Sequence, residues 1–211
     1  MQWEKLSETI QIAINDAHRF GTDAFLLEHF AAVRGIDTVC DLCAGCGIIG
    51  LLMLRRERPP QSVTAVEIAP DAVELMRQTA EISSLTHFAP LRGDLRGIRT
   101  LLPAHSFRLV TCNPPYFPAG SGYLCPEDSR RRARHEQEES CTIGEVCDAA
   151  AWLLQYGGRF CLCQRPERLT DVLLAMRQAG LEPKRLRWVQ QRPEKASWLF
   201  LVEGKAGAKP G

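Results

Sequence analysis

An alternation of strand-like and helix-like segments begins near residue 37 and continues almost to the end of the chain. Strands that alternate with helices in this way form a parallel sheet covered by helices. The last two expected strands follow each other without a helix, which predicts an antiparallel edge on a mostly parallel, seven-stranded α/β sheet. The expected strands are Thr38–Leu42, Ser62–Ile68, His87–Leu91, Phe107–Cys112, Arg159–Gln164, Leu186–Gln190 and Ser197–Val202, and the expected helices are Ile48–Arg56, Asp71–Ser83, Thr142–Tyr156 and Pro166–Ala179.

The pattern divides the chain into three parts. Residues 1–36 form an expected N-terminal extension, in which alternating isoleucines at 10, 12 and 14 suggest a strand and Thr22-Asp23 starts a helix. Residues 37–203 form the main domain, and Gly157-Gly158 is expected to end one of its helices. Residues 204–211 are small and polar and are expected to form a mobile tail.

Composition points to a folded chain without a membrane span. Of the 211 residues, 45% are hydrophobic, and 26 Lys+Arg nearly balance 25 Asp+Glu. The longest apolar run, Ile48–Leu54, is far shorter than the ~20 residues that a bilayer requires. The first residues lack the apolar core of a signal peptide, so we expect a cytoplasmic location and no membrane partner.

Nine cysteines are scattered along the chain, and Cys40, Cys43 and Cys46 form a C-x2-C-x2-C pattern. An odd number of scattered cysteines does not suggest a disulfide framework. An iron–sulfur run would continue with a further Cys-Pro near the position of Gly50 and Leu51, which the chain lacks. We therefore expect small buried thiols in a reducing compartment and no metal site.

The turn after the first strand of the main domain is rich in glycine. Gly45, Gly47 and Gly50 match a nucleotide-binding fingerprint, and Glu67 ends the next expected strand, where a carboxylate accepts hydrogen bonds from ribose hydroxyls. Asp41 places a negative charge beside the turn, which disfavours a pyrophosphate and suits a ligand that carries an ammonium and a sulfonium. The turn therefore favours S-adenosylmethionine over a nicotinamide dinucleotide, with a turn that binds no ligand as the structural alternative.

The tetrapeptide Asn113-Pro114-Pro115-Tyr116 follows the strand Phe107–Cys112, at the sheet edge where open α/β sheets bind ligands. The prolines fix φ and remove two N–H donors, so carbonyl groups face outward without competing donors. The Asn113 side-chain oxygen and the Pro114 carbonyl can both accept from one exocyclic amine, while Tyr116 offers a stacking face. This pattern predicts methyl transfer to an amine, with Asn113, Pro114 and Tyr116 as catalytic residues; the alternative is a rigid turn that packs an aromatic ring.

Five segments together resemble the bacterial methyltransferases that modify adenine 37 of a valine tRNA at N6, and the resemblance covers nearly the whole chain. The segments are Phe20–Leu27, Asp41–Gly50, Asn113–Phe117, Ala133–Glu136 and Pro166–Leu169. The resemblance implies a Rossmann-like class I methyltransferase fold, S-adenosylmethionine as cofactor, tRNA as partner and an extension that caps the cofactor site. It also implies that Asn113 and Tyr116 orient the adenine. The implied cofactor-binding residues are Thr22, Asp23, Asp41, Cys43, Gly45, Gly47, Glu67 and Asp94, with Cys43 at the position where the family most often has glycine.

The segment Phe117–Ser140 is long for a connection and adjoins the expected catalytic edge. Its basic run either holds RNA phosphates around a flipped-out base or forms a solvated helix start, and His135 is either a proton acceptor or a surface residue. The candidate substrate-binding residues are Phe117, Arg130, Arg131, Arg132, Arg134 and His135. A second basic group near the C-terminal hairpin consists of Lys184, Arg185, Arg187, Arg192 and Lys195.

Several other functions share parts of this pattern. A glutamine-N5 protein methyltransferase uses the same Asn-Pro-Pro-Tyr motif but carries a substantial helical domain ahead of its sheet, whereas the first expected strand of the main sheet here begins at Thr38. A guanine-N2 rRNA methyltransferase commonly has Phe in place of Tyr116. A non-catalytic RNA interaction module is expected to lose Asn113 or Glu67, and both are present. The sequence favours adenine N6 methylation of tRNA and leaves these alternatives open.

Overall fold

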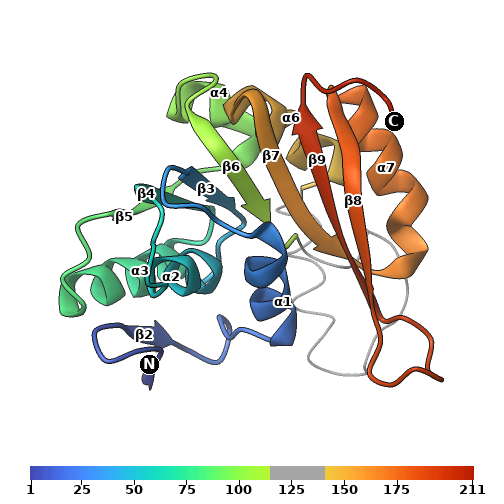
Figure 1. Cartoon of the computed structure of the whole chain (residues 1–211). Coiled ribbons are helices and arrows are strands. Elements are labelled where there is room, and N and C mark those ends of the chain that lie inside the picture. The colour runs from blue at the N-terminus through green and yellow to red at the C-terminus, as the bar shows by residue number, and fades with distance from the viewer. Residues whose placement is uncertain (115–140) are drawn as a thin grey trace.

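The computed structural model of the chain describes residues 1–114 and 141–211 (Figure 1). A seven-stranded sheet with the order β5-β4-β3-β6-β7-β9-β8 runs through its centre. The pairs from β5 to β7 are parallel, and β9 is antiparallel to both of its neighbours. This arrangement confirms the expected mostly parallel sheet with an antiparallel C-terminal hairpin. The strands are β3 (Thr38–Leu42), β4 (Ser62–Glu67), β5 (Phe88–Arg92), β6 (Phe107–Cys112), β7 (Leu154–Gln164), β8 (Leu181–Val189) and β9 (Leu199–Ala206).

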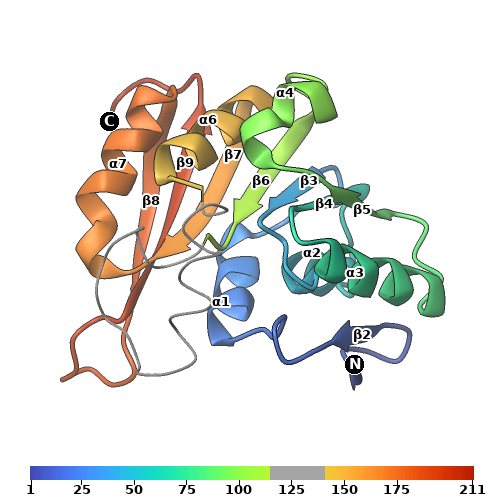
Figure 2. The same ribbon diagram turned by 180° about the vertical axis from the view of Figure 1, so that it is seen from behind.

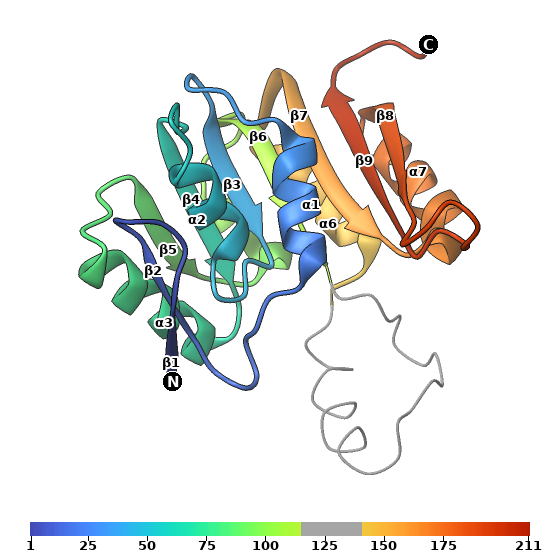
Figure 3. The same ribbon diagram turned by 60° about the horizontal axis from the view of Figure 1, so that its bottom comes forward.

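Helices cover both faces of the sheet because successive strand residues point to opposite sides. In β3, Val39 belongs to the core under α1, α2 and α3, whereas Cys40 belongs to the core under α4, α6 and α7. Figure 3 shows the first group of helices, and Figure 2 shows α6 and α7 on the opposite face. The helices are α1 (Thr22–Ala31), α2 (Ile48–Leu54), α3 (Pro70–Ile82), η1 (Leu95–Gly97), α4 (Ile98–Leu101), α6 (Ile143–Leu153), η2 (Pro166–Arg168) and α7 (Leu169–Gln178).

An additional two-stranded hairpin precedes α1. It consists of β1 (Gln2–Lys5) and β2 (Gln11–Ile14), of which the sequence predicted only the second. The hairpin packs beside α3: the Ala13 N–H donates to the Thr79 hydroxyl at 2.9 Å, and the Gln11 N–H donates to the Ser83 hydroxyl at 3.0 Å. The isoleucines of β2 thereby join the core on this side of the sheet.

The glycine pair Gly157-Gly158 lies inside a strand, so the expected helix end at these residues is wrong. Helix α6 ends at Leu153, and β7 begins with the next residue. The pairing of β6 with β7 shifts register at this point, and Gly157 has a φ of +76°. A Cβ on Gly158 would lie 2.9 Å from the Gln155 carbonyl oxygen. The two glycines therefore permit a β-bulge and do not terminate a helix.

The C-terminal hairpin is longer than the sequence suggested. Strand β9 continues to Ala206, so the boundary of the expected tail at residue 204 is corrected to a position beyond the strand. Gly204 pairs with Phe160 in β7, and a Cβ at this glycine would lie 2.3 Å from the Met176 side chain. A small residue at 204 reflects close packing of α7 on the strand and does not signal mobility.

The cysteines behave mainly as small buried residues. Cysteines 40, 46, 112, 147, 161 and 163 are buried free thiols. Burial raises the pKa of Cys46 and of Cys112 to about 11, so both remain protonated at neutral pH. Within residues 1–114 and 141–211, no group of three or more His, Cys, Asp or Glu side chains is arranged to hold a metal ion.

In the same part of the chain, none of the helices has the length and apolar character needed to cross a bilayer.

Arg159 ties the C-terminal end of α1 to the sheet. Its guanidinium donates to the Ala31 carbonyl at 2.6 Å and to the Asp37 carboxylate at 2.8 Å, and it lies 3.5 Å from Glu203. Carbonyl groups at the end of a helix lack partners within the helix and carry partial negative charge. The arginine therefore satisfies the helix end and two carboxylates together.

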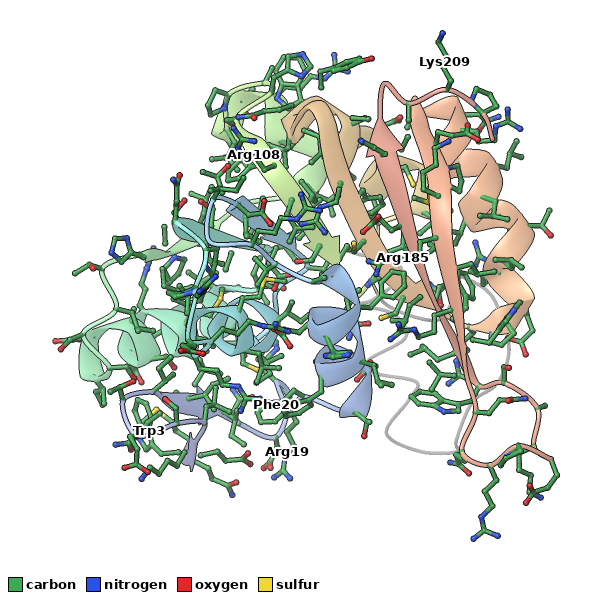
Figure 4. All side chains as sticks on the ribbon, in the orientation of Figure 1. Trp3, Arg19, Phe20, Arg108, Arg185 and Lys209 are labelled. Carbon is green, nitrogen blue, oxygen red and sulfur yellow. The ribbon has the colours of Figure 1, made fainter. Side chains whose placement is uncertain are left out.

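Arg185 makes a second link to the same helix end. It donates to the Phe30 carbonyl at 2.5 Å and to Glu203 at 2.8 Å, and its guanidinium lies 4.1 Å from the centre of the Phe30 ring. Figure 4 shows Arg185 between α1 and the β8–β9 hairpin. The two arginines fix α1 against β7, β8 and β9.

We expect Arg159→Ala to lower the free energy of unfolding by about 3–5 kcal/mol, because Asp37, with 3% of its surface exposed, would keep a buried charge without its main partner. Urea denaturation at neutral pH measures this loss. Arg168→Ala is the control, since Arg168 pairs with the exposed Asp171 and its loss is expected to cost less than about 1 kcal/mol. Equal effects of the two substitutions would contradict a structural role for Arg159.

Candidate functional site

Three adjacent strands end in register at one edge of the sheet. Leu42 in β3 pairs with Val66 in β4 and with Cys112 in β6. The residues that follow these three are Cys43, Glu67 and Asn113. Because neighbouring strands lie ~4.8 Å apart, the glycine-rich turn, the Glu67 carboxylate and the Asn113 amide come together at this edge. The structure thus places the turn and Glu67, which the sequence assigned to cofactor binding, beside Asn113, which the sequence assigned to catalysis.

The glycine-rich turn combines left-handed backbone with close packing. Cys43, Gly45 and Gly47 have φ values of +54°, +56° and +82°. A Cβ on Gly47 would lie 2.8 Å from the Phe88 ring and 2.9 Å from the Met76 sulfur, so only glycine fits there. A Cβ on Gly45 would meet no atom within 4 Å. Gly47 therefore allows close packing of the turn, whereas Gly45 leaves the backbone open to a ligand.

The Glu67 carboxylate stabilises the turn through backbone donors. One oxygen accepts from the Gly45 N–H at 2.8 Å, and the other accepts from the Ile68 and Ala69 N–H groups at 2.9 and 3.0 Å. A carboxylate has about four acceptor sites, so Glu67 can still accept from a ligand hydroxyl. The residue connects the end of β4 to the turn that follows β3.

Asp41 is a fully buried carboxylate near the end of β3. Its Oδ1 accepts a hydrogen bond of 2.6 Å from the Thr111 hydroxyl, whereas its Oδ2 has no partner among the described residues. Burial, assisted by the nearby Glu67 charge, raises the pKa of Asp41 from 3.8 to about 7 against the opposing effect of the Thr111 hydrogen bond. A buried carboxylate with one unused oxygen suits a cationic ligand.

Asp94 is engaged locally. Its carboxylate accepts from the Arg96 backbone N–H at 2.9 Å and from the Arg96 guanidinium at 2.5 and 2.8 Å. The Arg96 side chain holds the pKa of Asp94 below its usual value. The aspartate caps η1, so a ligand that binds at Asp94 would have to displace or share its contacts with Arg96.

The Asn113 side chain is held from both ends. Its Nδ2 donates to Oδ2 of Asp23, in the first turn of α1, at 2.9 Å, and its Oδ1 accepts from the buried Cys163 thiol at 3.1 Å. Pro114 is buried. Sequence reasoning assigned Asp23 only to the cofactor, and it gave no role to Cys163 or to Thr111, the partner of Asp41.

The remaining assigned residues divide into two groups. Thr22 is the exposed first residue of α1. The others lie outside the residues that the structure describes, so their assignments stay predictions. They are Tyr116, Phe117, Arg130, Arg131, Arg132, Arg134 and His135.

The raised pKa of Asp41 predicts a pH-dependent stability. The folded protein binds a proton at Asp41 more tightly than the unfolded chain does, so this contribution to stability declines as pH rises from about 4 to about 7. Between about pH 5 and pH 8, we expect the wild type to lose about 3 kcal/mol of unfolding free energy relative to Asp41→Asn, measured by urea denaturation. A constant difference between the two proteins over this range would contradict a raised pKa.

A family model described as the methyltransferase small domain matches residues 17–123. Among curated proteins, tRNA1(Val) (adenine(37)-N6)-methyltransferases are similar to the chain. The protein from Tolumonas auensis is 32% identical over 78% of this chain and 66% of its own length, and the protein from Erwinia tasmaniensis is 30% identical over 69% and 58%. The chain thus spans less than two thirds of these relatives.

Solved structures share the fold at low sequence identity. TrmN from Thermus thermophilus superimposes with a TM-score of 0.59 at 22% identity, covering 86% of this chain and 48% of that protein. M. jannaschii TYW2 in complex with AdoMet gives a TM-score of 0.63 at 14% identity, covering 96% and 84%. These likenesses confirm the Rossmann-like class I methyltransferase fold. Together with the family match over residues 17–123, they show that the chain belongs to the methyltransferase small domain family.

Proposed function

We propose that the chain transfers a methyl group from S-adenosylmethionine to the exocyclic N6 of adenine in tRNA, at anticodon-loop adenine 37 of a valine tRNA. The observation that carries this proposal is the Asn113 amide, which is held at the sheet edge one strand away from the glycine-rich turn. The names of the relatives from Tolumonas and Erwinia support the choice of tRNA and of adenine N6.

The residues around the turn fit S-adenosylmethionine. The unpartnered Asp41 oxygen would pair with the positive charge of the ligand, and the open face of Gly45 would let the backbone approach it. Glu67 would accept from ribose hydroxyls at the end of β4. When bound, the cofactor supplies a methyl group attached to a sulfonium sulfur. The thioether that remains after the transfer is a good leaving group. The further residues that we assign to this site are Thr22, Cys43, Gly47 and Asp94.

The protein prepares the amine for attack. In our proposal, Asn113 Oδ1 and the Pro114 carbonyl accept from the two N–H groups of the substrate amine. These hydrogen bonds fix the amine and draw its lone pair out of conjugation with the ring. Bound S-adenosylmethionine would supply the methyl carbon to this nitrogen, with its sulfur leaving as a neutral thioether. The alkylated nitrogen is acidic and loses its proton to water, so no strong general base is needed.

The tip of the β8–β9 hairpin offers a surface for RNA at the same edge. Gln164, the last residue of β7, pairs with Phe200, so the connection between β8 and β9 lies at the carboxyl edge of the parallel strands (Figure 1). We define the hairpin surface as the exposed side chains of Arg192, Lys195 and Trp198 in the connection between β8 and β9. Cations bind phosphates and indole rings stack on unpaired bases, so this surface suits a tRNA loop.

The first test of the function is methylation itself. Purified protein, transfer RNA and labelled S-adenosylmethionine should yield N6-methyladenosine after digestion to nucleosides. We expect Asn113→Ala to lower kcat by about 10²–10³-fold, because it removes the acceptor for the amine, while the Kd for S-adenosylhomocysteine stays within about threefold. Unchanged turnover of Asn113→Ala, or label in guanine or in protein glutamine, would contradict the proposal.

The second test concerns the hairpin surface. We expect the double substitution Arg192→Ala and Lys195→Ala to weaken tRNA binding and to reduce the slope of log K against log salt by about 1.4, since each lost phosphate contact on a single-stranded loop removes about 0.7. The control is Arg108→Ala with Lys209→Ala, which removes two cations at the opposite edge (Figure 4). Equal slopes for both double variants would exclude the hairpin tip from RNA binding.

A further inference from the structure

The contact between Asp23 and Asn113 determines how the amide is oriented. An ionised carboxylate only accepts hydrogen bonds, so the atom of Asn113 that faces Asp23 at 2.9 Å must be the amide nitrogen. The amide oxygen therefore points to the other side, where the Cys163 thiol lies 3.1 Å away. A thiol is a weak donor, so Oδ1 can exchange or share this contact with a stronger N–H donor.

We propose that Asp23 is a positioning residue for methyl transfer: its carboxylate holds the Asn113 amide with the oxygen toward the substrate amine. This inference rests on the proposed function and changes the assignment of Asp23 from the cofactor to Asn113. Without Asp23, the amide could rotate by half a turn and present N–H groups to an amine that needs acceptors.

The local sequence provides a place for the carboxylate. Asp23 lies in the first turn of α1, where the partial positive charge of the helix N-terminus stabilises an anion. Gly21 precedes the helix, and a Cβ at Gly21 would lie only 2.7 Å from Asp23 Oδ1. The absence of a side chain at residue 21 therefore leaves the space that the Asp23 carboxylate occupies.

The rest of α1 keeps Asp23 in position. Ala24, Leu27 and Phe30 are buried in the core under the helix. At the other end, Arg159 and Arg185 donate to the last carbonyl groups of the helix. The helix is thus fixed along its buried face and at its C-terminal end, so that its N-terminal turn meets the end of β6 in one geometry.

The negative charge adds a second effect. A carboxylate that accepts from the amide nitrogen polarises the amide and increases the electron density on Oδ1, which strengthens the next hydrogen bond in the chain. Positive charge develops on the substrate nitrogen as the new bond to carbon forms. A fixed anion behind Asn113 stabilises that charge in the transition state more than in the ground state.

The test separates turnover from cofactor binding. We expect Asp23→Ala to lower kcat by about 100-fold and Asp23→Asn, which keeps an acceptor oxygen but no charge, by about tenfold. Both should bind S-adenosylhomocysteine with a Kd within about threefold of the wild type. Asp171→Ala is the matched control, since Asp171 is an exposed first-turn aspartate on α7 that pairs with Arg168, and its kcat should stay unchanged.

A second readout does not depend on activity. The side-chain amide resonances of Asn113 can be assigned by their absence in Asn113→Ala, and they should shift in Asp23→Ala and Asp23→Asn but not in Asp171→Ala. Unchanged Asn113 resonances in Asp23→Ala would overturn the proposed contact. An unchanged kcat in Asp23→Ala would overturn the positioning role. If kcat is retained while the Kd for S-adenosylhomocysteine rises in proportion to the loss of kcat/KM, Asp23 acts on cofactor binding and the positioning role is likewise overturned. A wild-type protein that methylates no tRNA would overturn the proposed function as a whole, whereas an active wild type limits the failure to Asp23.

Discussion

The in-register parallel pairing of β3 with β4 and β6 is the constraint on which the site depends. It brings the residues after Leu42, Val66 and Cys112 to one edge of the sheet, so that a turn, a carboxylate and an amide meet although they lie far apart in the sequence. Each of these three strand ends supplies a different group: the open backbone of the glycine-rich turn, the Glu67 carboxylate and the Asn113 amide, to which we assign a ligand hydroxyl and a substrate amine in our proposal. Helix α1 completes the edge from outside the sheet, and Arg159 and Arg185 fix that helix.

Negative charge gathers around this edge. Asp41, Glu67 and Asp23 lie on three different elements that converge there, and the buried Asp41 carries its charge at the expense of stability, as its pKa of about 7 indicates. Such an arrangement opposes a phosphate ligand and favours a cationic one. The buried Asp41 charge therefore lowers the stability of the ligand-free protein, and a sulfonium or ammonium ligand can offset this loss when it binds.

The alternation of strands and helices was sufficient to predict the sheet, and β6 begins and ends where its apolar run does. Glycines were less informative, because Gly157-Gly158 permits a bulge and Gly204 permits close packing by Met176, and neither feature leaves a periodic signal. The glycine-rich turn and the position of Glu67 could be predicted from a local motif, and the structure places the two in contact. The contacts of Asn113 could not, since Asp23 is 90 positions away and Cys163 is 50 positions away, and only the packing of α1 and β7 on β6 brings them together.

A crystal structure with S-adenosylhomocysteine and an adenosine-containing anticodon stem-loop tests the central claim most directly. The account predicts that the exocyclic nitrogen of one adenine lies within hydrogen-bonding distance of both Asn113 Oδ1 and the Pro114 carbonyl, with its free face toward the cofactor sulfur. It also predicts that Asn113 Nδ2 still donates to Asp23. An adenine held elsewhere, or an Asn113 amide turned with its nitrogen toward the base, would contradict the account.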